Sequence, residues 1–324
     1  MNVALNGCGR VGRALIEHWL TQEDMPKIVL IRRKNYQWRR KDGLSREELS
    51  TFLDTGRFPR TKVKSIQDNL YDRDIDVWFE LTPTDLSQAE RVHRDMQSVL
   101  ISGVSIIFAN KAPVVHDYLK LKRLADSFGA ELGLSAVMGA SLPGLALARY
   151  GAMGATITEL AGSLNATTNF VLEQMEQGQT FEQAIDQAVR LGIAEGDWSQ
   201  DIDGIDSAIK LSILASVLFE RNVPLDRSRI QGIRHLTPAM IQRLKAQDKR
   251  YKLIARYREG EVSVSAEECS IDQLFYHIGG SQKILWLATK ELSDMSVMSG
   301  RSGLAEVAAS LQRDLVAIQQ ELGR

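Results

Sequence analysis

The stretch with the most chemically capable side chains is residues 192–210, which reads GIAEGDWSQDIDGIDSAIK. Its six ionisable side chains are Glu195, Asp197, Asp201, Asp203, Asp206 and Lys210. The run 211–219 that follows is hydrophobic nearly all round, which indicates a buried helix. Lys210 stands at the head of that helix. Asp206, four residues earlier, shares its face, so the two charges can pair there.

Composition leaves two interpretations of this stretch open. Acidic residues favour the first turn of a helix, so Asp203 would cap the buried helix and the cluster would be a solvated helix terminus. The alternative is a functional site, because a charge near a buried helix is costly unless it is paired. The rest of the chain must decide between them.

The chain begins with a short strand, residues 1–5, followed by NGCGRVGR and an amphipathic run over 14–20. The pattern G-x-G-x-x-G between a strand and a helix is typical of dinucleotide binding. Gly7 permits the tight turn, Gly9 lets the backbone approach a pyrophosphate, and Gly12 lets the helix pack on the strand. Arg10 and Val11 lie inside this turn and are expected to contact the cofactor. The alternative is a glycine-rich structural turn.

The second strand, residues 27–31, ends in Arg32, Arg33 and Lys34, with no carboxylate where a ribose hydroxyl would need one. Arg side chains suit a 2′-phosphate, so NADP is preferred over NAD, which stays an alternative. Further basic residues at 39–41 keep a second interpretation open, a solvated basic loop.

Two more strand ends carry polar groups. The strand 74–81 is followed by Thr82, and the strand 104–108 by Asn110 and Lys111. Ligands of doubly wound sheets bind outside the carboxyl ends of the strands, so these residues are candidates for a site. Lys111 is alternatively a surface residue. Helices are expected over 45–53, where Ser45 and Glu48 form a capping box, and over 87–100 and 115–128.

The second half of the chain has a different pattern. Strands are expected at 156–164, 251–257, 262–266, 283–289 and 295–298, and helices at 170–176, 181–191 and 303–322. The later strands lie close together without long helices between them, so a mixed or antiparallel sheet is expected. We predict an α/β chain with a Rossmann-type doubly wound sheet in residues 1–134, an α+β unit in 135–302, and a terminal helix in 303–324 that packs on the first unit.

Composition narrows the classes of function. Hydrophobic residues make up 44% and charged residues 25% of the chain, and the net charge is −1, which favours neither a nucleic-acid nor a membrane partner. The two cysteines, Cys8 and Cys269, lack metal-ligand spacing and predict reduced thiols in a cytoplasmic protein. No signal peptide is expected before the first strand.

Five blocks of the chain together resemble the homoserine dehydrogenase family, in its short form without a fused kinase or ligand-sensing domain. They are the glycine-rich turn, Ala109-Asn110-Lys111, the loop 139–143, the block 164–169, and the spacing of Glu195, Asp197, Asp201, Asp206 and Lys210. The last block is the most specific. The resemblance favours a site over a solvated helix terminus.

The resemblance implies reversible oxidation of homoserine to aspartate 4-semialdehyde with NAD(P), and a homodimer formed through the second unit. It implies that Lys210 handles the alcohol proton and that Asp206 holds Lys210. It also implies that Lys111 contacts the reacting oxygen. Glu195 would bind the α-ammonium of the substrate, and Asp201 and Thr167 would complete the same pocket.

The chain departs from the family pattern at Ala166, Trp198 and Ser135. Ser135 stands where relatives that bind a monovalent cation have a glutamate. A sodium site would depend on the carbonyl groups of Met138, Ala140 and Leu142, and none is predicted with them alone. Two other functions stay open: another NAD(P)-dependent oxidoreductase of amino-acid metabolism, and a cofactor-binding regulator that has lost turnover.

Overall fold

The computed structural model describes residues 1–59, 61–62, 66, 70, 74–194, 197–300 and 303–323. It divides into two units, Met1–Ala140 with Leu304–Arg324, and Ser141–Gly303. The helix at the end of the chain therefore belongs to the first unit. Among the described residues, no helix has both the length and the apolar composition needed to cross a membrane.

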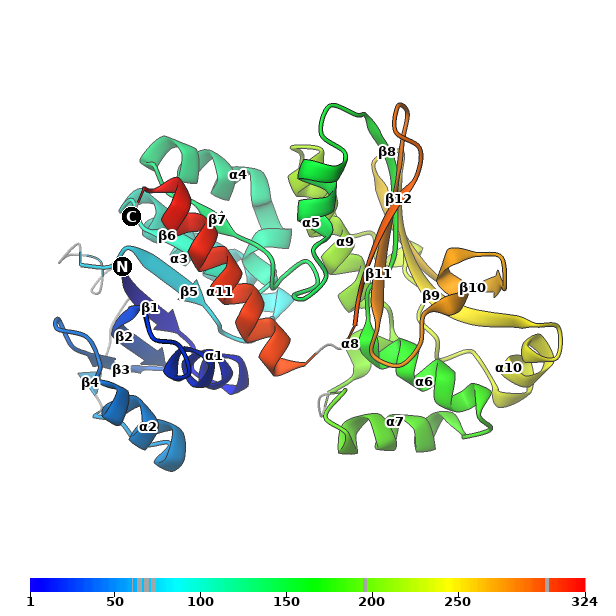
Figure 1. The fold of residues 1–324 in the computed structure, drawn as a ribbon, viewed down its shortest axis with the longest axis horizontal. Coiled ribbons are helices and arrows are strands. Elements are labelled where there is room, and N and C mark those ends of the chain that lie inside the picture. The colour runs from blue at the N-terminus through cyan, green and yellow to red at the C-terminus, as the bar shows by residue number, and fades with distance from the viewer. Residues whose placement is uncertain are drawn as a thin grey trace. The chain divides into compact units, whose positions relative to one another are not determined.

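The first unit is built on a seven-stranded sheet (Figure 1). Its strands are β1 (Asn2–Asn6), β2 (Lys27–Arg33), β3 (Tyr36–Arg39), β4 (Thr61–Lys62), β5 (Val77–Glu80), β6 (Ser105–Phe108) and β7 (Leu132–Gly133). The spatial order is β4-β3-β2-β1-β5-β6-β7. The five strands β2, β1, β5, β6 and β7 are parallel, while β3 and β4 extend one edge in antiparallel pairs. The predicted doubly wound parallel sheet is confirmed, with an antiparallel edge that the sequence analysis did not predict.

The helices of this unit are α1 (Arg10–Leu20), α2 (Arg46–Thr55), α3 (Ala89–Ile101), α4 (Ala112–Phe128) and α11 (Leu304–Glu321), with a 3₁₀ turn at Leu86–Gln88. Ser45 and Glu48 form the predicted capping box of α2. Figure 1 shows α11 lying across the sheet beside α1. Trp19 of α1 is buried there, with its ring edge against Phe79 and its Nε1 donating to Gln312 Oε1 of α11 at 2.6 Å. The terminal helix therefore packs on the first unit.

The second unit is built on a five-stranded sheet of order β10-β9-β8-β11-β12 whose strand pairs are all antiparallel. Its strands are β8 (Ile157–Ser163), β9 (Lys249–Arg258), β10 (Glu261–Ser270), β11 (Lys283–Thr289) and β12 (Met295–Ser299). Its helices are α5 (Gly144–Ala146), α6 (Ala166–Glu176), α7 (Phe181–Arg190), α8 (Ser199–Ile202), α9 (Ile205–Leu218) and α10 (Pro238–Lys245); short 3₁₀ or π turns lie at Leu147–Gly151, Arg227–Arg229 and Leu274–His277.

Two helix starts differ from the sequence-based expectation. Helix α6 begins at Ala166 rather than at residue 170, because Asn165 caps it through its side chain, which accepts from the Thr168 amide at 2.9 Å. The proposed cap of α9 by Asp203 is wrong. The N-cap is Gly204, at a φ of 81° that favours glycine, and the Asp203 carboxylate instead pairs with Arg234.

Candidate active site

The carboxyl ends of β1, β5 and β6 lie at one edge of the first sheet, because these strands are parallel neighbours. The residues after them are the glycine-rich turn, Thr82, and Asn110 with Lys111. Asn110 is buried, and its Nδ2 donates to the Thr82 hydroxyl at 2.9 Å. The Lys111 amide donates to Thr84 Oγ1 at 3.1 Å. The structure therefore brings together the polar groups that the sequence analysis selected after β5 and β6.

The three glycines of the turn have different surroundings. A Cβ at Gly7 would lie 2.7 Å from the carbonyl carbon of Leu81, and one at Gly12 would lie 2.9 Å from the Gly7 carbonyl oxygen. A Cβ at Gly9 would have no heavy atom within 4 Å. Gly7 and Gly12 are thus required for packing, whereas Gly9 opens onto free space at the N-terminus of α1. This arrangement fits a pyrophosphate that approaches the backbone and the positive end of the helix dipole.

The two arginines at the end of β2 lie in different environments. The Arg32 guanidinium lies over the Trp78 ring, 5.8 Å from its centroid, whereas Arg33 is exposed. Burial raises the pKa of the Cys8 thiol to about 12, and the nearby positive charges of Arg13 and Arg33 oppose that rise. Two guanidinium groups, one from α1 and one from β2, therefore lie near the glycine-rich turn.

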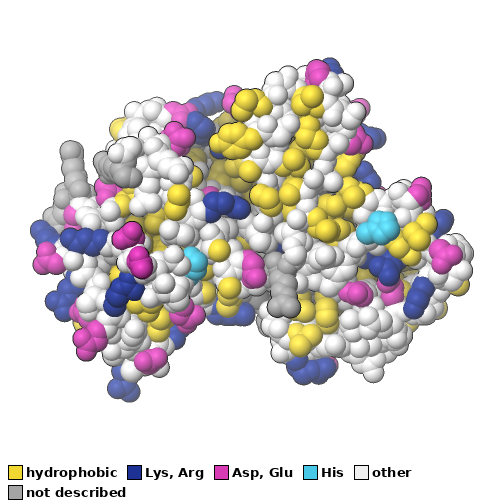
Figure 2. Space-filling model, in the orientation of Figure 1, with side chains coloured by type: hydrophobic (Ala, Val, Ile, Leu, Met, Phe, Trp, Pro, Cys, Tyr) yellow, Lys and Arg dark blue, Asp and Glu magenta, His cyan; other side chains and the backbone are white. Residues whose placement is uncertain are grey.

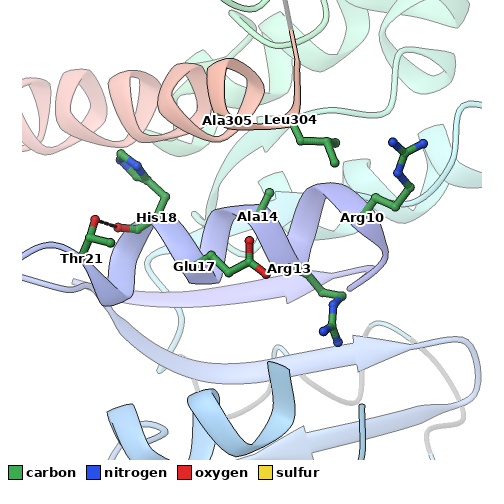
Figure 3. Close-up of a pocket in the computed structure, with 8 residues that line it drawn as sticks. All are labelled: Arg10, Arg13, Ala14, Glu17, His18, Thr21, Leu304 and Ala305. Carbon is green, nitrogen blue, oxygen red and sulfur yellow. Dashed lines mark hydrogen bonds between the residues drawn. The ribbon is translucent and has the colours of Figure 1, made fainter. Parts of the chain in front are cut away.

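The exposed face of α1 lines a pocket of about 500 Å³ at the start of α11 (Figure 3). Arg10 and Arg13 both line it, but their side chains point in different directions. Arg13 points toward α2, where its guanidinium donates to the Leu53 carbonyl. Val11 is half-buried and packs against the apolar core, so its backbone is the part of it that the turn can present to a ligand.

A hydrogen-bonded cluster in the second unit joins three segments. Asn165 Nδ2, between β8 and α6, donates to Asp201 Oδ1 of α8 at 2.7 Å and to Asp206 Oδ2 of α9 at 2.9 Å. The Thr167 hydroxyl donates to Asp201 Oδ2 at 2.7 Å. Lys210 Nζ lies 2.5 Å from Asp206 Oδ2. The structure therefore brings together four of the residues selected from the sequence, Thr167, Asp201, Asp206 and Lys210.

Two oxygens hold the Lys210 ammonium. It pairs with Asp206 and also donates to the Leu164 carbonyl at 2.9 Å. The side chains of Lys210 and Asp206 are only 12% and 13% exposed, so this pair is shielded from solvent far more than a surface pair. Because an ammonium has three N–H groups, the partners found among the described residues leave one N–H for a ligand.

Asp201 has an unusual electrostatic environment for a carboxylate. Burial raises its pKa, and the neighbouring charge of Asp206 raises it further. Hydrogen bonds from Thr167 and Asn165 and the charge of Lys210 act in the opposite direction. Perturbed acidic groups that share a site with a lysine are typical of catalytic centres, although structural ion pairs also produce them.

The family model for homoserine dehydrogenase matches residues 143–316. The chain belongs to the homoserine dehydrogenase family. The homoserine dehydrogenase of Methanocaldococcus jannaschii is 30% identical over 246 residues, which cover 76% of this chain and 73% of that protein. The NAD(+)-dependent homoserine dehydrogenase of Pseudomonas canavaninivorans is 29% identical over 254 residues, covering 77% of this chain and 72% of its own. A hyperthermophilic archaeal homoserine dehydrogenase solved in complex with NADPH has the same fold, with a TM-score of 0.81 and 24% identity over 99% of this chain and 98% of its own.

This homoserine dehydrogenase family member is an NAD(P)-dependent homoserine oxidoreductase. The sequence analysis missed one residue of its acidic cluster, Asn165, which bridges the two aspartates. The available signal was an asparagine between a strand and a helix, where it serves as an N-cap. Glu195, predicted to bind the substrate ammonium, lies outside the described residues.

Two departures from the homoserine dehydrogenase pattern have structural explanations. Trp198 precedes α8 and packs edge-on against Phe181, and the Arg234 guanidinium lies over its ring, 5.0 Å from the centroid. Trp198 is therefore a packing residue. Ser135 donates its amide and hydroxyl to the Asp314 carboxylate of α11, at 2.8 and 2.5 Å. This fixes the start of the loop 135–143.

The three carbonyl groups considered for sodium are not equally available. The Ala140 carbonyl accepts a hydrogen bond from the Arg313 guanidinium at 3.0 Å, and the Leu142 carbonyl accepts the Gly144 amide at 2.9 Å. A cation at Ala140 would meet the positive charge of Arg313. These contacts argue against a sodium ion at Met138, Ala140 and Leu142.

Replacing Asp201 with asparagine is expected to stabilise the protein and to weaken its activity. Because the folded-state pKa of Asp201 is raised, its stabilising contribution is present at low pH and is lost as the pH rises through that pKa, so the ionised group costs stability near pH 7. Asp201→Asn should therefore melt at a higher temperature at pH 7, with a smaller gain near pH 4. We expect kcat/KM for homoserine to fall about tenfold to a hundredfold, because a charged hydrogen-bonding group is lost from the pocket.

The matched control is Asp197→Asn in the same stretch. Asp197 is exposed, and hydrogen bonds from Ser199 lower its pKa, so its removal should slightly lower the melting temperature at pH 7. Calorimetry of both variants and wild type at pH 4 and pH 7 measures the sign of each change in melting temperature. A stability of Asp201→Asn, relative to wild type, that does not increase between pH 4 and pH 7 would contradict the assignment of a raised pKa.

Proposed function

We propose that the chain interconverts L-homoserine and L-aspartate 4-semialdehyde with Lys210 as the residue that handles the alcohol proton. The observation that carries this proposal is the Lys210 ammonium, held by Asp206 and the Leu164 carbonyl in the second turn of the buried helix α9. When bound, the nicotinamide cofactor accepts the hydride that leaves the carbinol carbon. The protein must then remove the hydroxyl proton, and a positioned amine can do so directly or through one water.

Each residue of the cluster has a proposed part. As a neutral amine, Lys210 keeps two N–H groups on Asp206 and the Leu164 carbonyl and turns its lone pair to the substrate hydroxyl. It accepts the hydroxyl proton through that lone pair, and Asp206 stabilises the ammonium that results. Asp201 and Thr167 line the pocket for the zwitterionic substrate, and Glu195 binds its α-ammonium. Lys111 contacts the reacting oxygen. Asn165 orients both aspartates through its single amide nitrogen.

The proposal is tested by following the near-ultraviolet absorbance of the reduced nicotinamide in the presence of homoserine and NADP. Absorbance that rises only when both are present supports the dehydrogenase. Cofactor binding without turnover would instead support the second function, a regulator that has kept only the cofactor site.

We propose NADP as the preferred cofactor, with Arg33 as its principal 2′-phosphate residue. Arg33 is exposed and acts electrostatically on Cys8 in the glycine-rich turn, whereas the Arg32 guanidinium lies over Trp78. Gly7, Gly9, Gly12, Arg10 and Val11 hold the pyrophosphate, and Thr82 and Asn110 contact the nicotinamide half. Among the relatives, one was solved with NADPH and another is NAD(+)-dependent, so the family name alone does not fix the preference.

Arg33→Ser is expected to raise the KM for NADP about tenfold or more and to change the KM for NAD less than about twofold. The reason is that the 2′-phosphate, absent from NAD, loses a charged hydrogen bond. Initial rates with both cofactors at fixed ionic strength measure this, and Arg123→Ser, an exposed arginine of α4, is the control for loss of charge. Equal changes in both KM values would refute the assignment.

We also propose that two copies associate through the second unit and that the protein is cytoplasmic. Large apolar side chains are exposed on this unit at Tyr150, Met153, Leu292 and Met298. Figure 2 shows hydrophobic side chains gathered over the region of β8 and β12. Exposed apolar patches commonly mark protein interfaces, which supports a homodimer. The two free, buried cysteines agree with a reducing compartment.

A further inference from the structure

Glu80, the last residue of β5, has a fully buried carboxylate to which no role has yet been given. Asn6 Nδ2 at the end of β1 donates to its Oε2 at 2.6 Å, and the Thr82 hydroxyl donates to its Oε1. The Trp78 indole N–H is 3.5 Å from Oε2. A buried carboxylate is costly to keep without such donors, so its presence in this sheet requires an explanation.

The backbone of Glu80 extends these contacts to the third strand end. Its carbonyl oxygen accepts the amides of Ala109 at 2.9 Å and Asn110 at 3.1 Å, directly after β6. The Asn110 side chain in turn donates to the Thr82 hydroxyl at 2.9 Å. Glu80 therefore links the ends of β1, β5 and β6, the three segments proposed to hold the cofactor.

The Thr82 hydroxyl is the centre of this chain of hydrogen bonds. It donates its single proton to Glu80 and accepts from Asn110. A hydroxyl has only one proton, so the carboxylate fixes the direction of the whole chain: Thr82 must donate to Glu80 and can only accept from Asn110. The Asn110 Oδ1 then faces the Ala112 amide, to which it is bonded at 2.9 Å.

The same segment packs directly against the glycine-rich turn. A Cβ at Gly7 would lie 2.8 Å from the Thr82 nitrogen, which shows how closely the two backbones approach. A displacement of Thr82 would therefore shift the backbone at Gly7 as well as the side chain of Asn110.

We propose that Glu80 is a positioning residue for the nicotinamide cofactor: its carboxylate orients the Thr82 hydroxyl, and through it the Asn110 amide, for cofactor binding. This inference rests on the proposed function, because it takes the cofactor to lie at these strand ends. Burial raises the pKa of the Glu80 carboxyl above its ordinary value, and the hydrogen bonds from Thr82 and Asn6 oppose that rise.

The test is binding of NADPH to Glu80→Gln, measured by fluorescence titration of the full chain. A glutamine presents an NH₂ group where one of the two acceptor oxygens stood, so either Asn6 or Thr82 loses its acceptor. We expect the dissociation constant to rise about tenfold, in line with the loss of a charged hydrogen bond. Glu131→Gln, an exposed glutamate of the same unit, should bind like wild type.

A second pair of variants separates positioning from general support of the fold. Thr82→Val removes the hydroxyl and should lose as much affinity as Glu80→Gln, whereas Thr82→Ser keeps the hydroxyl and should stay within about twofold of wild type. Because Glu80 acts through Thr82, the double variant Glu80→Gln/Thr82→Val should bind no more weakly than Thr82→Val alone, which is the signature of coupled residues.

Three results would overturn the inference: unchanged affinity in Glu80→Gln, unchanged affinity in Thr82→Val, or fully additive losses in the double variant. The Thr82 pair decides the matter even if Glu80→Gln does not fold. Absence of saturable NADPH binding by the wild-type chain would instead reject the proposed cofactor site. If the wild-type chain binds NADPH and the variants bind it with the same affinity, only the role of Glu80 is rejected.

Discussion

Replacing Lys210 with methionine is expected to lower kcat about 10³-fold or more while the cofactor still binds. Methionine keeps most of the side-chain volume at this position of α9 but removes the amine that we propose takes the alcohol proton. General acid–base groups typically contribute about 10² to 10⁴ in rate. The KM for the nicotinamide cofactor should change little, because the residues proposed to bind the cofactor belong to the other unit of the chain. Steady-state kinetics with saturating homoserine measure the effect.

The chain offers a matched control for this substitution. Lys122 and Asp126 of α4 form the same type of helical ion pair, four residues apart, but both are largely exposed. Lys122→Met should leave kcat unchanged and cost little stability, as exposed pairs do. Lys210→Met should also lower the melting temperature, since Asp206 loses its charged partner. The activities of Lys210→Met and wild type are therefore compared at a temperature well below the unfolding transition of the variant.

Lys210→Arg gives a further check on the role of the amine. It keeps the positive charge beside Asp206 but replaces the amine with a guanidinium, which does not give up its proton in proteins. We expect Lys210→Arg to be more stable than Lys210→Met but to have an equally low kcat. Substantial turnover in either Lys210 variant would show that another group accepts the proton.

The sequence predicted the Lys210–Asp206 pair because both residues lie on one helix, four positions apart, where local geometry fixes the contact. The contacts of Asn165 were not predictable in this way. Its amide meets Asp201 and Asp206 across 36 and 41 residues of sequence, and that approach depends on how β8, α8 and α9 pack. Asp203 shows the opposite error. Its residue type and position favoured a local helix cap, but its carboxylate pairs with Arg234, 31 residues away in the sequence.

A similar limit applies in the first unit. The order strand, glycine-rich turn and helix predicted a candidate cofactor site, because the glycine spacing reflects local backbone requirements. The adjacent arginines Arg32 and Arg33 could not be distinguished from sequence, although neighbours on a strand point to opposite faces of the sheet. Glu80 received no role from the sequence for another reason: the three segments that it contacts, the ends of β1, β5 and β6, come together only in the folded sheet.

The glycine-rich turn provides the last prediction: Gly9→Ala should abolish tight cofactor binding without unfolding the protein. Gly9 has a φ of −87°, outside the left-handed region, and an added Cβ would meet no atom within 4 Å. The melting temperature should therefore change by only a few degrees, within the small cost of alanine at an N-cap. The methyl group would occupy the space through which the pyrophosphate approaches the backbone, so the NADPH dissociation constant should rise well over tenfold.

The other glycines supply the comparison that makes this result interpretable. Gly300 also has open space around its Cβ position and no left-handed φ, so Gly300→Ala makes the same chemical change in the second unit and should bind NADPH normally. Gly7→Ala should instead lose stability, because Gly7 has a φ of 97° and its Cβ would strike the Leu81–Thr82 peptide. If Gly9→Ala binds NADPH as tightly as wild type, the open space above this turn is not where the phosphates lie, and the cofactor site must be placed elsewhere on the chain.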